Sequence, residues 1–127
     1  MEHTRSATLG TVDDGGRPHL VPIVFGYRNG RLCTAVDQKP KSTYRLKRIR
    51  NIETNPQVSV LLDHYDNDWA RLWWIRIDGT ARLLGSGPGF DEGIALLTHK
   101  YPPYLTQPPP GPLVEVEVES IRAWSAT

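Results

Sequence analysis

The sequence predicts a mainly β protein, in which about six antiparallel strands close into a small barrel and two helices are inserted between strands. Two consecutive turn signals, DDGGRP and Asn29-Gly30, join apolar runs in the first third of the chain, as in successive β-hairpins. Near the other end, Leu113–Ile121 alternates between apolar and charged residues with the period of a strand. A sheet with few covering helices tends to curl and close on itself. The 127 residues fit a single domain, 1–127.

Three strands are expected before the first helix. Residues 7–12 (ATLGTV) form the first, and DDGGRP supplies the turn that follows it. Residues 19–27 (HLVPIVFGY) form the second, and Pro22 belongs at an edge, a bulge or the mouth of the barrel because it cannot donate to a ladder. Asn29-Gly30 then turns the chain into a third strand at residues 32–36.

A basic helix should follow the third strand. Six basic residues and no acidic residue lie between Lys39 and Arg50. Pro40 fits the turn before the helix, Ser42 or Thr43 can serve as its N-cap, and Pro56 predicts an end near Thr54. Two sets of residues at helical spacing lie on adjoining faces. Lys41, Arg45 and Arg48 form a cationic face, beside the apolar stripe of Leu46, Ile49 and Ile52, which is expected to pack inward.

The rest of the chain adds three strands and a second helix. Strands are expected at residues 57–63, at 73–84 with a bulge at Gly79, and at 113–121. A helix at about residues 90–100 precedes a proline-rich, extended connection. In the last strand, Val114, Val116 and Val118 should face the core, and Glu115, Glu117 and Glu119 the solvent.

Composition limits the classes of function. A net charge of +1 argues against a general nucleic-acid or membrane-surface role. The single cysteine, Cys33, leaves no internal disulfide or multi-cysteine metal site, and it is expected to be a small buried apolar residue. His3, His19, His64 and His99 are scattered, so no metal site is expected. Without a signal peptide or an apolar membrane span, a cytoplasmic protein is the default.

The basic helix is a candidate phosphate site. Charge beside a buried stripe is costly unless an anion meets it, and a first turn with Lys39, Lys41 and free backbone N–H groups suits a phosphate. A solvated basic face on an ordinary amphipathic helix would look the same in sequence. Both interpretations stay open on these residues alone.

The aromatic run at residues 64–76 (HYDNDWARLWWIR) is the second candidate. Trp73 and Ile75 should lie on one face of a strand, and Trp74 and Arg76 on the other. One Trp could fill a dimer interface, or it could pack against a planar ring while an arginine meets an anionic group. A basic helix suited to phosphate binding, a proline-containing strand and nearby aromatic residues together predict a site for a phosphorylated planar cofactor.

These motifs resemble a known family. The segment from Gly10 to Asp63, with its DDGGRPHLVP run and the helix ending RNIETNP, is similar to the opening half of pyridoxamine 5'-phosphate oxidase-like split barrels. The run DWARLWWIR is similar to an actinobacterial subgroup that uses the deazaflavin coenzyme F420. The resemblance implies a homodimer of six-stranded antiparallel split β-barrels, with two cofactor sites at the subunit interface and a small-molecule substrate.

The resemblance also implies which residues bind the cofactor. The phosphate would be held by Lys39, Lys41, Ser42, Thr43, Arg45 and Arg48. The backbone of Val21, Pro22 and Ile23 would run beside the ring system, and Trp73, Trp74 and Arg76 would line the ring or substrate side. The implied activity is hydride transfer from reduced F420 to a small organic acceptor, with no catalytic side chain assigned. The alternatives are an FMN-dependent oxidoreductase and a non-catalytic carrier of F420 or flavin.

Overall fold

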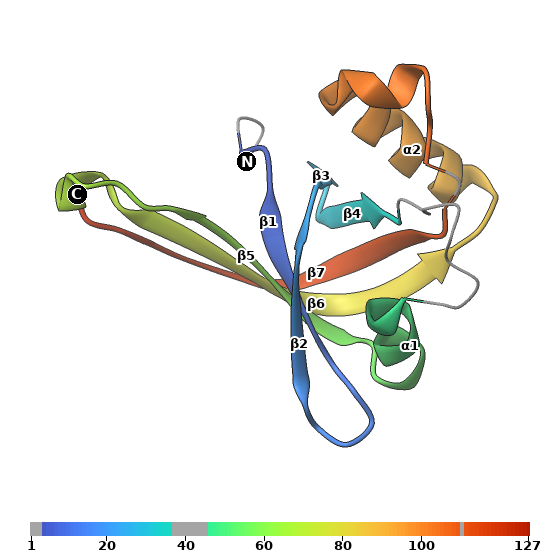
Figure 1. Ribbon diagram of the computed structural model, residues 1–127, viewed down its shortest axis with the longest axis horizontal. Helices are drawn as coiled ribbons and strands as arrows, with labels where there is room; N and C mark the ends of the chain where they lie inside the picture. The colour runs from blue at the N-terminus through green and yellow to red at the C-terminus, as the bar shows by residue number, and fades with distance from the viewer. Residues whose placement is uncertain (1–3, 37–45, 110) are drawn as a thin grey trace.

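The structure, a computed structural model, describes residues 4–36, 46–109 and 111–127 (Figure 1). This part of the chain forms a seven-stranded antiparallel sheet in the order β2-β1-β5-β6-β7-β4-β3, with two α-helices. In chain order the elements are β1 (Ala7–Val12), β2 (Pro18–Ile23), β3 (Gly26–Arg28), β4 (Arg31–Ala35), α1 (Lys47–Thr54), β5 (Gln57–His64), β6 (Trp73–Leu84), α2 (Pro88–Lys100) and β7 (Leu113–Ser125), with 3-10 turns at Trp69–Arg71 and Pro102–Leu105. The mainly β, split-barrel class predicted from the sequence is confirmed.

The extra strand arises because the expected strand at residues 19–27 is divided. Its first part is β2, which pairs with β1, and its last part is β3, which pairs with β4 at the opposite edge of the sheet. Phe25 lies between the two parts and is fully buried. The Tyr101 hydroxyl accepts a hydrogen bond from the Phe25 N–H and lies 3.1 Å from the Phe25 carbonyl oxygen, so this backbone is satisfied without a ladder. The chain can therefore cross from one sheet edge to the other.

Both predicted hairpins are confirmed. At the first, the Asp13 carboxylate accepts hydrogen bonds from the N–H groups of Gly15 and Arg17. At the second, Asn29 and Gly30 have φ angles of 52° and 77°, as a two-residue turn between Arg28 and Arg31 requires. Pro22 lies in β2, which is an edge strand, as its missing N–H predicts.

Helix α1 packs against the sheet through the expected stripe. Ile49 and Ile52 are buried, and the side-chain amide of the buried Asn51 donates to Thr11 Oγ1 at 3.0 Å, which ties the helix to β1. The helix ends at Thr54, as Pro56 predicted. The expected first turn, with Ser42 or Thr43 as N-cap, lies outside the described residues.

Strands β5, β6 and β7 extend beyond the barrel as a long arm that carries the C-terminus at its tip (Figure 1). The bulge predicted at Gly79 is confirmed by a register shift between Asp78 and Gly79. A Cβ atom at Gly79 would collide with the backbone oxygen of Glu117, so the β6–β7 approach requires glycine at this position.

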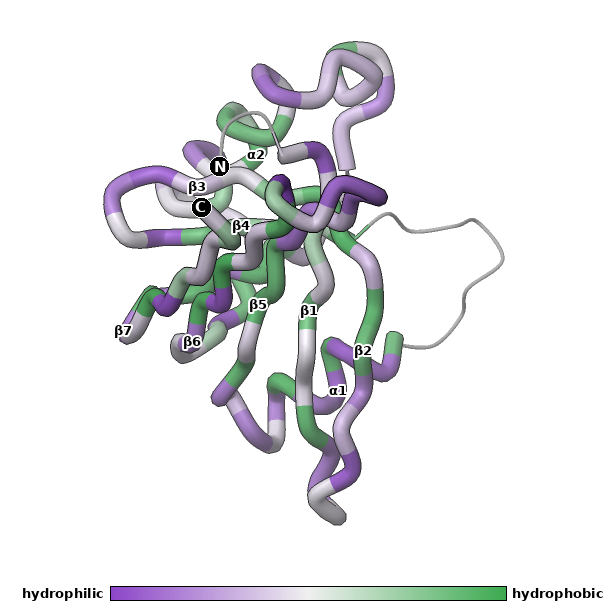
Figure 2. The backbone as a smooth tube through the Cα atoms, turned by 90° about the vertical axis from the view of Figure 1, so that its left-hand side faces the viewer, coloured by the Kyte–Doolittle hydropathy of each residue, from purple (hydrophilic) through white to green (hydrophobic). Residues whose placement is uncertain are grey.

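Hydrophobic residues recur along the strands of the sheet (Figure 2), and the buried ones form two clusters. The larger cluster lies inside the barrel and includes Leu9, Phe25, Leu32, Val60, Leu62 and Ile77. The second lies under α2 and includes Cys33, Ala35, Leu97, Tyr101 and Leu113. Because α2 covers this second cluster, Glu115 is only 7% exposed, and its predicted solvent orientation is wrong. Within the described residues, no helix has the length and apolar character of a membrane span.

Candidate functional site

A cavity of about 260 Å³ brings together three of the residues implicated by the sequence. Pro22 and Ile23 line it from the end of β2, and Arg48 lines it from α1. The remaining wall comes from the N-terminal segment, the β2–β3 connection, the end of β4 and the 3-10 turn after α2. These residues are Ser6, Val24, Thr34, Ala35 and Tyr104. We call this space the Arg48 cavity.

The orientation of Arg48 follows from the packing of α1. Ile49 and Ile52 anchor the helix on the core, which leaves Arg48 half-buried at the side that borders the cavity. Lys47 points elsewhere, toward Asp13 on the β1–β2 turn, with Nζ 3.7 Å from Oδ2. The N–H of Arg17, which bonds to the Asp13 carboxylate, holds the pKa of that group below its usual value. Of these two neighbouring basic residues, Lys47 therefore lies at the turn and Arg48 at the cavity.

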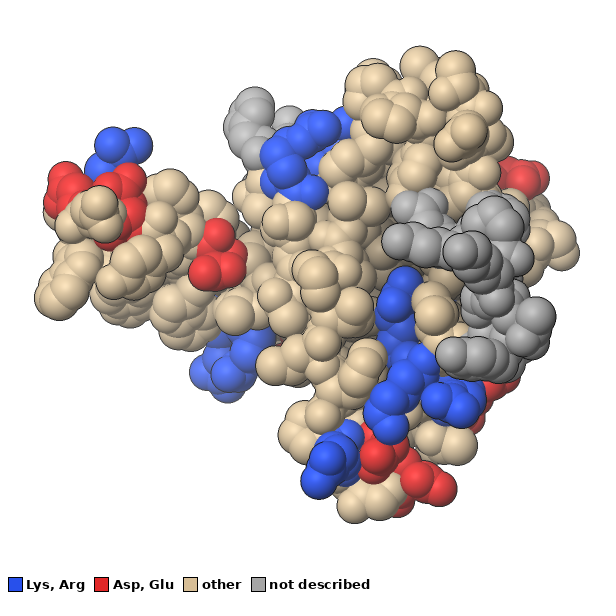
Figure 3. Space-filling view, viewed as in Figure 1, with Lys and Arg blue, Asp and Glu red and all other residues tan. Residues whose placement is uncertain are grey.

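Basic atoms also gather on the surface around α1. Figure 3 shows a strip of Lys and Arg atoms over α1 and the neighbouring end of the β1–β2 hairpin, with acidic atoms at one end of the strip. Arg50 is exposed on the helix, and Lys47 and Arg48 precede it. The predicted phosphate ligands Lys39, Lys41, Ser42, Thr43 and Arg45 lie outside the described residues. The cationic face is thus described only through its last member, Arg48.

The aromatic candidates lie in a different place. Trp73 and Trp74 line a separate cavity of about 360 Å³ on the arm, together with Ile75, Ala123, Trp124 and Ser125. The Trp73 ring stacks on His64 with 6.2 Å between centroids. Within one chain this cavity shares no lining residue with the Arg48 cavity. The sequence grouped the two sets of residues, but a single chain does not bring them together.

Arg76 forms an ion pair with a neighbouring carboxylate on the same strand. Its Nε donates to Asp78 Oδ2 at 3.2 Å, and Asp78 Oδ1 accepts from the Ser59 hydroxyl at 2.6 Å. The Ser59 hydrogen bond, followed by the charge of Arg76, keeps the pKa of Asp78 below its usual value. Val21, also implicated, lies on β2 directly before the residues that line the Arg48 cavity.

The sequence did not identify five of the residues that line the Arg48 cavity, among them Tyr104 and Thr34. Tyr104 lies in the proline-rich connection, which carries no periodic signal, and Thr34 is an interior strand residue. Cys33 is buried as expected, and burial raises the pKa of its thiol to about 11, so it stays protonated and weakly nucleophilic at neutral pH. Among the described residues, no three His, Cys, Asp or Glu side chains converge on a common point.

Several solved structures share this fold. A conserved hypothetical protein from Mycobacterium tuberculosis has a TM-score of 0.76 at 20% identity, covering 98% of this chain and 79% of the other. HutZ, the heme storage protein from Vibrio cholerae, has a TM-score of 0.76 at 18% identity, covering 98% and 87%. A FAD-binding protein from Mesorhizobium loti has a TM-score of 0.70 at 20% identity, covering 96% and 86%. At these identities the likeness shows the fold alone.

Sequence comparison supplies the family. None of the curated proteins matches the chain. The family model described as pyridoxamine 5'-phosphate oxidase, however, matches residues 1–125, from before β1 to the end of β7. Since that match spans every described element of the sheet, this chain belongs to the pyridoxamine 5'-phosphate oxidase family.

Proposed function

We propose that the protein is an F420-dependent oxidoreductase that transfers hydride from the reduced deazaflavin to a small organic acceptor. The observation that carries the proposal is the Arg48 cavity, which Arg48 of α1 lines together with Pro22 and Ile23 of β2. When bound, the cofactor supplies the hydride, and the protein binds and orients the reactants and excludes water.

The lining of the cavity fits a phosphorylated planar group. Ile23, Val24 and Ala35 supply apolar walls, the Tyr104 ring offers a flat surface, and Arg48 offers a permanent positive charge for a phosphate. Because β2 is an edge strand, the backbone groups on its outer side do not pair with another strand. These groups can lie beside the ring system of a cofactor. Arg48 would hold the phosphate together with Lys39, Lys41, Ser42, Thr43 and Arg45, as the resemblance to the F420-using subgroup implies.

A homodimer is part of the proposal. The arm exposes large apolar side chains, including Trp69, Ile121 and Trp124, which are 70%, 48% and 46% exposed. Apolar and aromatic surface of this kind favours association with another protein surface. Pairing of two arms would cover it, and the second copy would bring Trp73, Trp74 and Arg76 toward the Arg48 cavity of the first.

Two alternatives use the same cavity. An FMN-dependent oxidoreductase is consistent with the family, and the similar protein from Mesorhizobium loti is described as FAD-binding. A non-catalytic carrier is favoured by one observation: the residues that line the Arg48 cavity include no carboxylate and no imidazole among those that the structure describes. The lining residues with a hydroxyl group that could donate a proton are Ser6, Thr34 and Tyr104.

Binding and turnover measurements separate these functions. Fluorescence titrations with F420, FMN and heme should give the tightest binding for F420, and reduced F420 should then be oxidised in the presence of an enone, quinone or nitroaromatic acceptor. The double substitution Lys41→Ala with Arg45→Ala should weaken F420 binding at least tenfold, because charge-assisted phosphate contacts are lost. Tighter binding of FMN would favour the first alternative. Binding of F420 without turnover on any acceptor would favour the carrier.

A further inference from the structure

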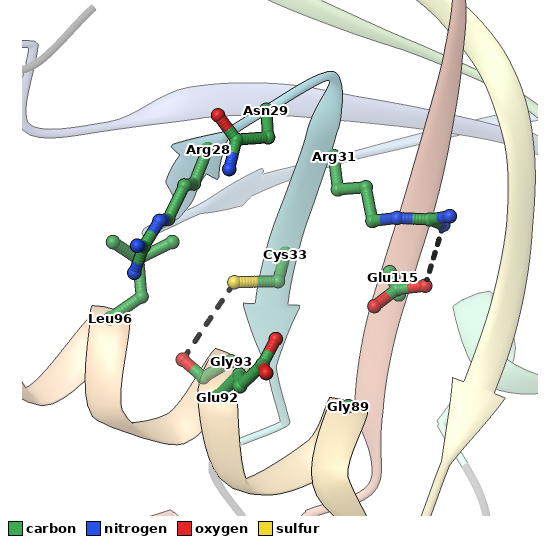
Figure 4. Close-up of a pocket in the computed structure, with 9 residues that line it drawn as sticks. All are labelled: Arg28, Asn29, Arg31, Cys33, Gly89, Glu92, Gly93, Leu96 and Glu115. Atoms are coloured by element: carbon green, nitrogen blue, oxygen red, sulfur yellow. Dashed lines mark hydrogen bonds and ion pairs between the residues drawn. The ribbon is translucent and has the colours of Figure 1, made fainter.

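A third cavity, of about 370 Å³, opens between the β3–β4 hairpin, α2 and β7 (Figure 4). Arg28 and Asn29 border it from the hairpin, Glu92 and Leu96 from α2, and Glu115 from β7, with Cys33 as its floor. We call it the hairpin cavity. Its described lining shares no residue with the Arg48 cavity, so it does not belong to the proposed cofactor site.

Glu115 presents one carboxylate oxygen, Oε2, to this space. Its Oε1 accepts hydrogen bonds from Arg31 Nη1 at 3.1 Å and from Arg82 Nε at 2.8 Å, and it forms an ion pair with Arg82 Nη2 at 2.6 Å. The other oxygen, Oε2, lies beside the cavity-lining residue Gly89, 3.8 Å from the position that a Cβ atom would take there. The Glu115 side chain is only 9% exposed. A carboxylate oxygen that borders a cavity can accept a hydrogen bond from a donor group of a ligand, and a charged oxygen accepts most strongly from a cation.

Two further charges face the cavity and are not neutralised within the described chain. The Glu92 carboxylate points into the cavity from α2, and the Arg28 side chain extends along the opposite border toward Leu96 (Figure 4). Neither forms an ion pair with a described residue, whereas Arg31 is held by Glu115. Two carboxylates therefore face one part of the cavity, and a guanidinium with the Asn29 amide faces another.

The space between these charges is neutral and open. Leu96 gives it an apolar wall. The Cys33 thiol donates a hydrogen bond to the Gly93 carbonyl oxygen, with 3.8 Å between Sγ and the oxygen. Burial raises the pKa of this thiol, which keeps it uncharged at neutral pH. Gly89 and Gly93 line the helix side without side chains of their own. The volume lies within the range of small-molecule sites.

We propose that the hairpin cavity binds a small zwitterion of the free α-amino acid class. Its ammonium group donates to Glu115 Oε2 and to Glu92, and its carboxylate accepts from Arg28 and the Asn29 amide. An anion without an ammonium group would leave Glu92 without a cation, and a cation without a carboxylate would leave Arg28 unpaired. The side chain of the ligand lies beside Leu96. This site does not depend on the cofactor assignment.

Titration of the isotopically labelled wild-type protein, followed by amide NMR, tests the charge pattern. L-Leucine is the first probe, with 3-methylbutylamine and 4-methylpentanoate as analogues that each lack one charge. Saturable shifts at the amides of Asn29, Gly89 and Gly93 are expected with L-leucine, and binding of either analogue should be at least tenfold weaker. Absence of saturable shifts with L-leucine, or shifts confined to another part of the chain, would overturn the proposal. So would an amine that binds as tightly as L-leucine.

Two substitutions test the assignment of each charge. Glu92→Gln and Arg28→Gln should each weaken L-leucine binding at least tenfold, since each removes one charged contact from a partly enclosed site. Asp91→Asn is the matched control, because Asp91 neighbours Glu92 on α2 but does not line the cavity. Wild-type affinity in both cavity variants would contradict the proposal, as would equal weakening by the control. F420 affinity, measured in parallel, should be unchanged in all three variants.

Discussion

Glu115 Oε1 accepts hydrogen bonds from both Arg31 and Arg82, so a single buried carboxylate oxygen joins β4, β7 and β6. Arg82 lies directly opposite Glu115 in the β6–β7 register, and Arg31 lies on β4 at the other side of β7. The two guanidinium groups remain about half exposed, with side-chain exposures of 49% and 61%. The pair of arginines therefore keeps contact with water while it neutralises the carboxylate.

Loss of this carboxylate should destabilise the sheet. Glu115→Ala removes two hydrogen bonds and the ion pairs with Arg31 and Arg82, and it leaves two arginines that can return to water, so we expect the free energy of unfolding to fall by roughly 1–3 kcal/mol. Urea unfolding of the variant and the wild type measures the change. Glu117→Ala is the control on the same strand, because Glu117 is exposed and should change stability by less than about 0.5 kcal/mol. Equal losses in the two variants would refute a special role for Glu115.

The Tyr101 hydroxyl should be needed where the chain crosses between sheet edges. It accepts from the Phe25 N–H and lies 3.0 Å from the Arg5 carbonyl oxygen. Tyr101→Phe would leave the buried Phe25 N–H without an acceptor, at an expected cost of roughly 1–3 kcal/mol. Thermal and urea unfolding measure this, with Tyr65→Phe as the control because Tyr65 is 71% exposed. No difference between the two variants would mean that the crossing does not depend on this hydroxyl.

Burial of Cys33 predicts a pH dependence of stability. Its thiol pKa is raised from 9.0 to about 11, so above about pH 9 the unfolded chain releases the proton while the folded protein keeps it. Stability is therefore fully present below that pH, and it falls as the pH rises toward about 11, by at most roughly 2–3 kcal/mol. Cys33→Ala should show a shallower loss over this range in urea unfolding. Parallel pH profiles for the two proteins would contradict the assignment.

The same burial should protect the thiol from modification. A disulfide reagent at neutral pH should react with Cys33 at the rate of global or local opening, and much faster once the protein is unfolded in urea. Rapid reaction of the native protein would contradict the burial of Cys33.

The exposed apolar residues of the arm should mediate self-association. Trp124→Asp places a charge on the arm, and we expect light scattering after size exclusion to show a shift from dimer to monomer. Leu105→Asp is the control, since Leu105 is 72% exposed but lies on the 3-10 turn after α2. A wild-type protein that is monomeric at all concentrations would remove the dimer from the proposal.

Local signals were sufficient to predict most of the elements. The Asn29-Gly30 turn needs only two residues with positive φ, and the boundaries of β6 and the Gly79 bulge follow from alternation and one glycine. The division of the strand at residues 19–27 depends on Tyr101, which is more than seventy residues away in sequence. The burial of Glu115 likewise depends on how α2 packs over the sheet. Neither contact leaves a pattern in the local sequence.

The sequence also predicted one part of the candidate site and missed the separation of another part. Arg48, Pro22 and Ile23 were grouped from the sequence, and they line one cavity because α1 is anchored by Ile49 and Ile52. Trp73, Trp74 and Arg76 were grouped with them, but the length of β6 carries these residues out along the arm. The distance along a strand determines this separation, and residue type alone gives no information about it.

Titration of F420 against the Arg48→Gln variant tests the central claim most directly. Arg50→Gln is the matched control, since Arg50 is exposed on the same helix and does not line the cavity. The account predicts that the dissociation constant rises at least tenfold for Arg48→Gln and changes less than about twofold for Arg50→Gln, with both variants folded. Wild-type affinity for F420 in the Arg48→Gln variant would contradict the assignment of this cavity as the cofactor site.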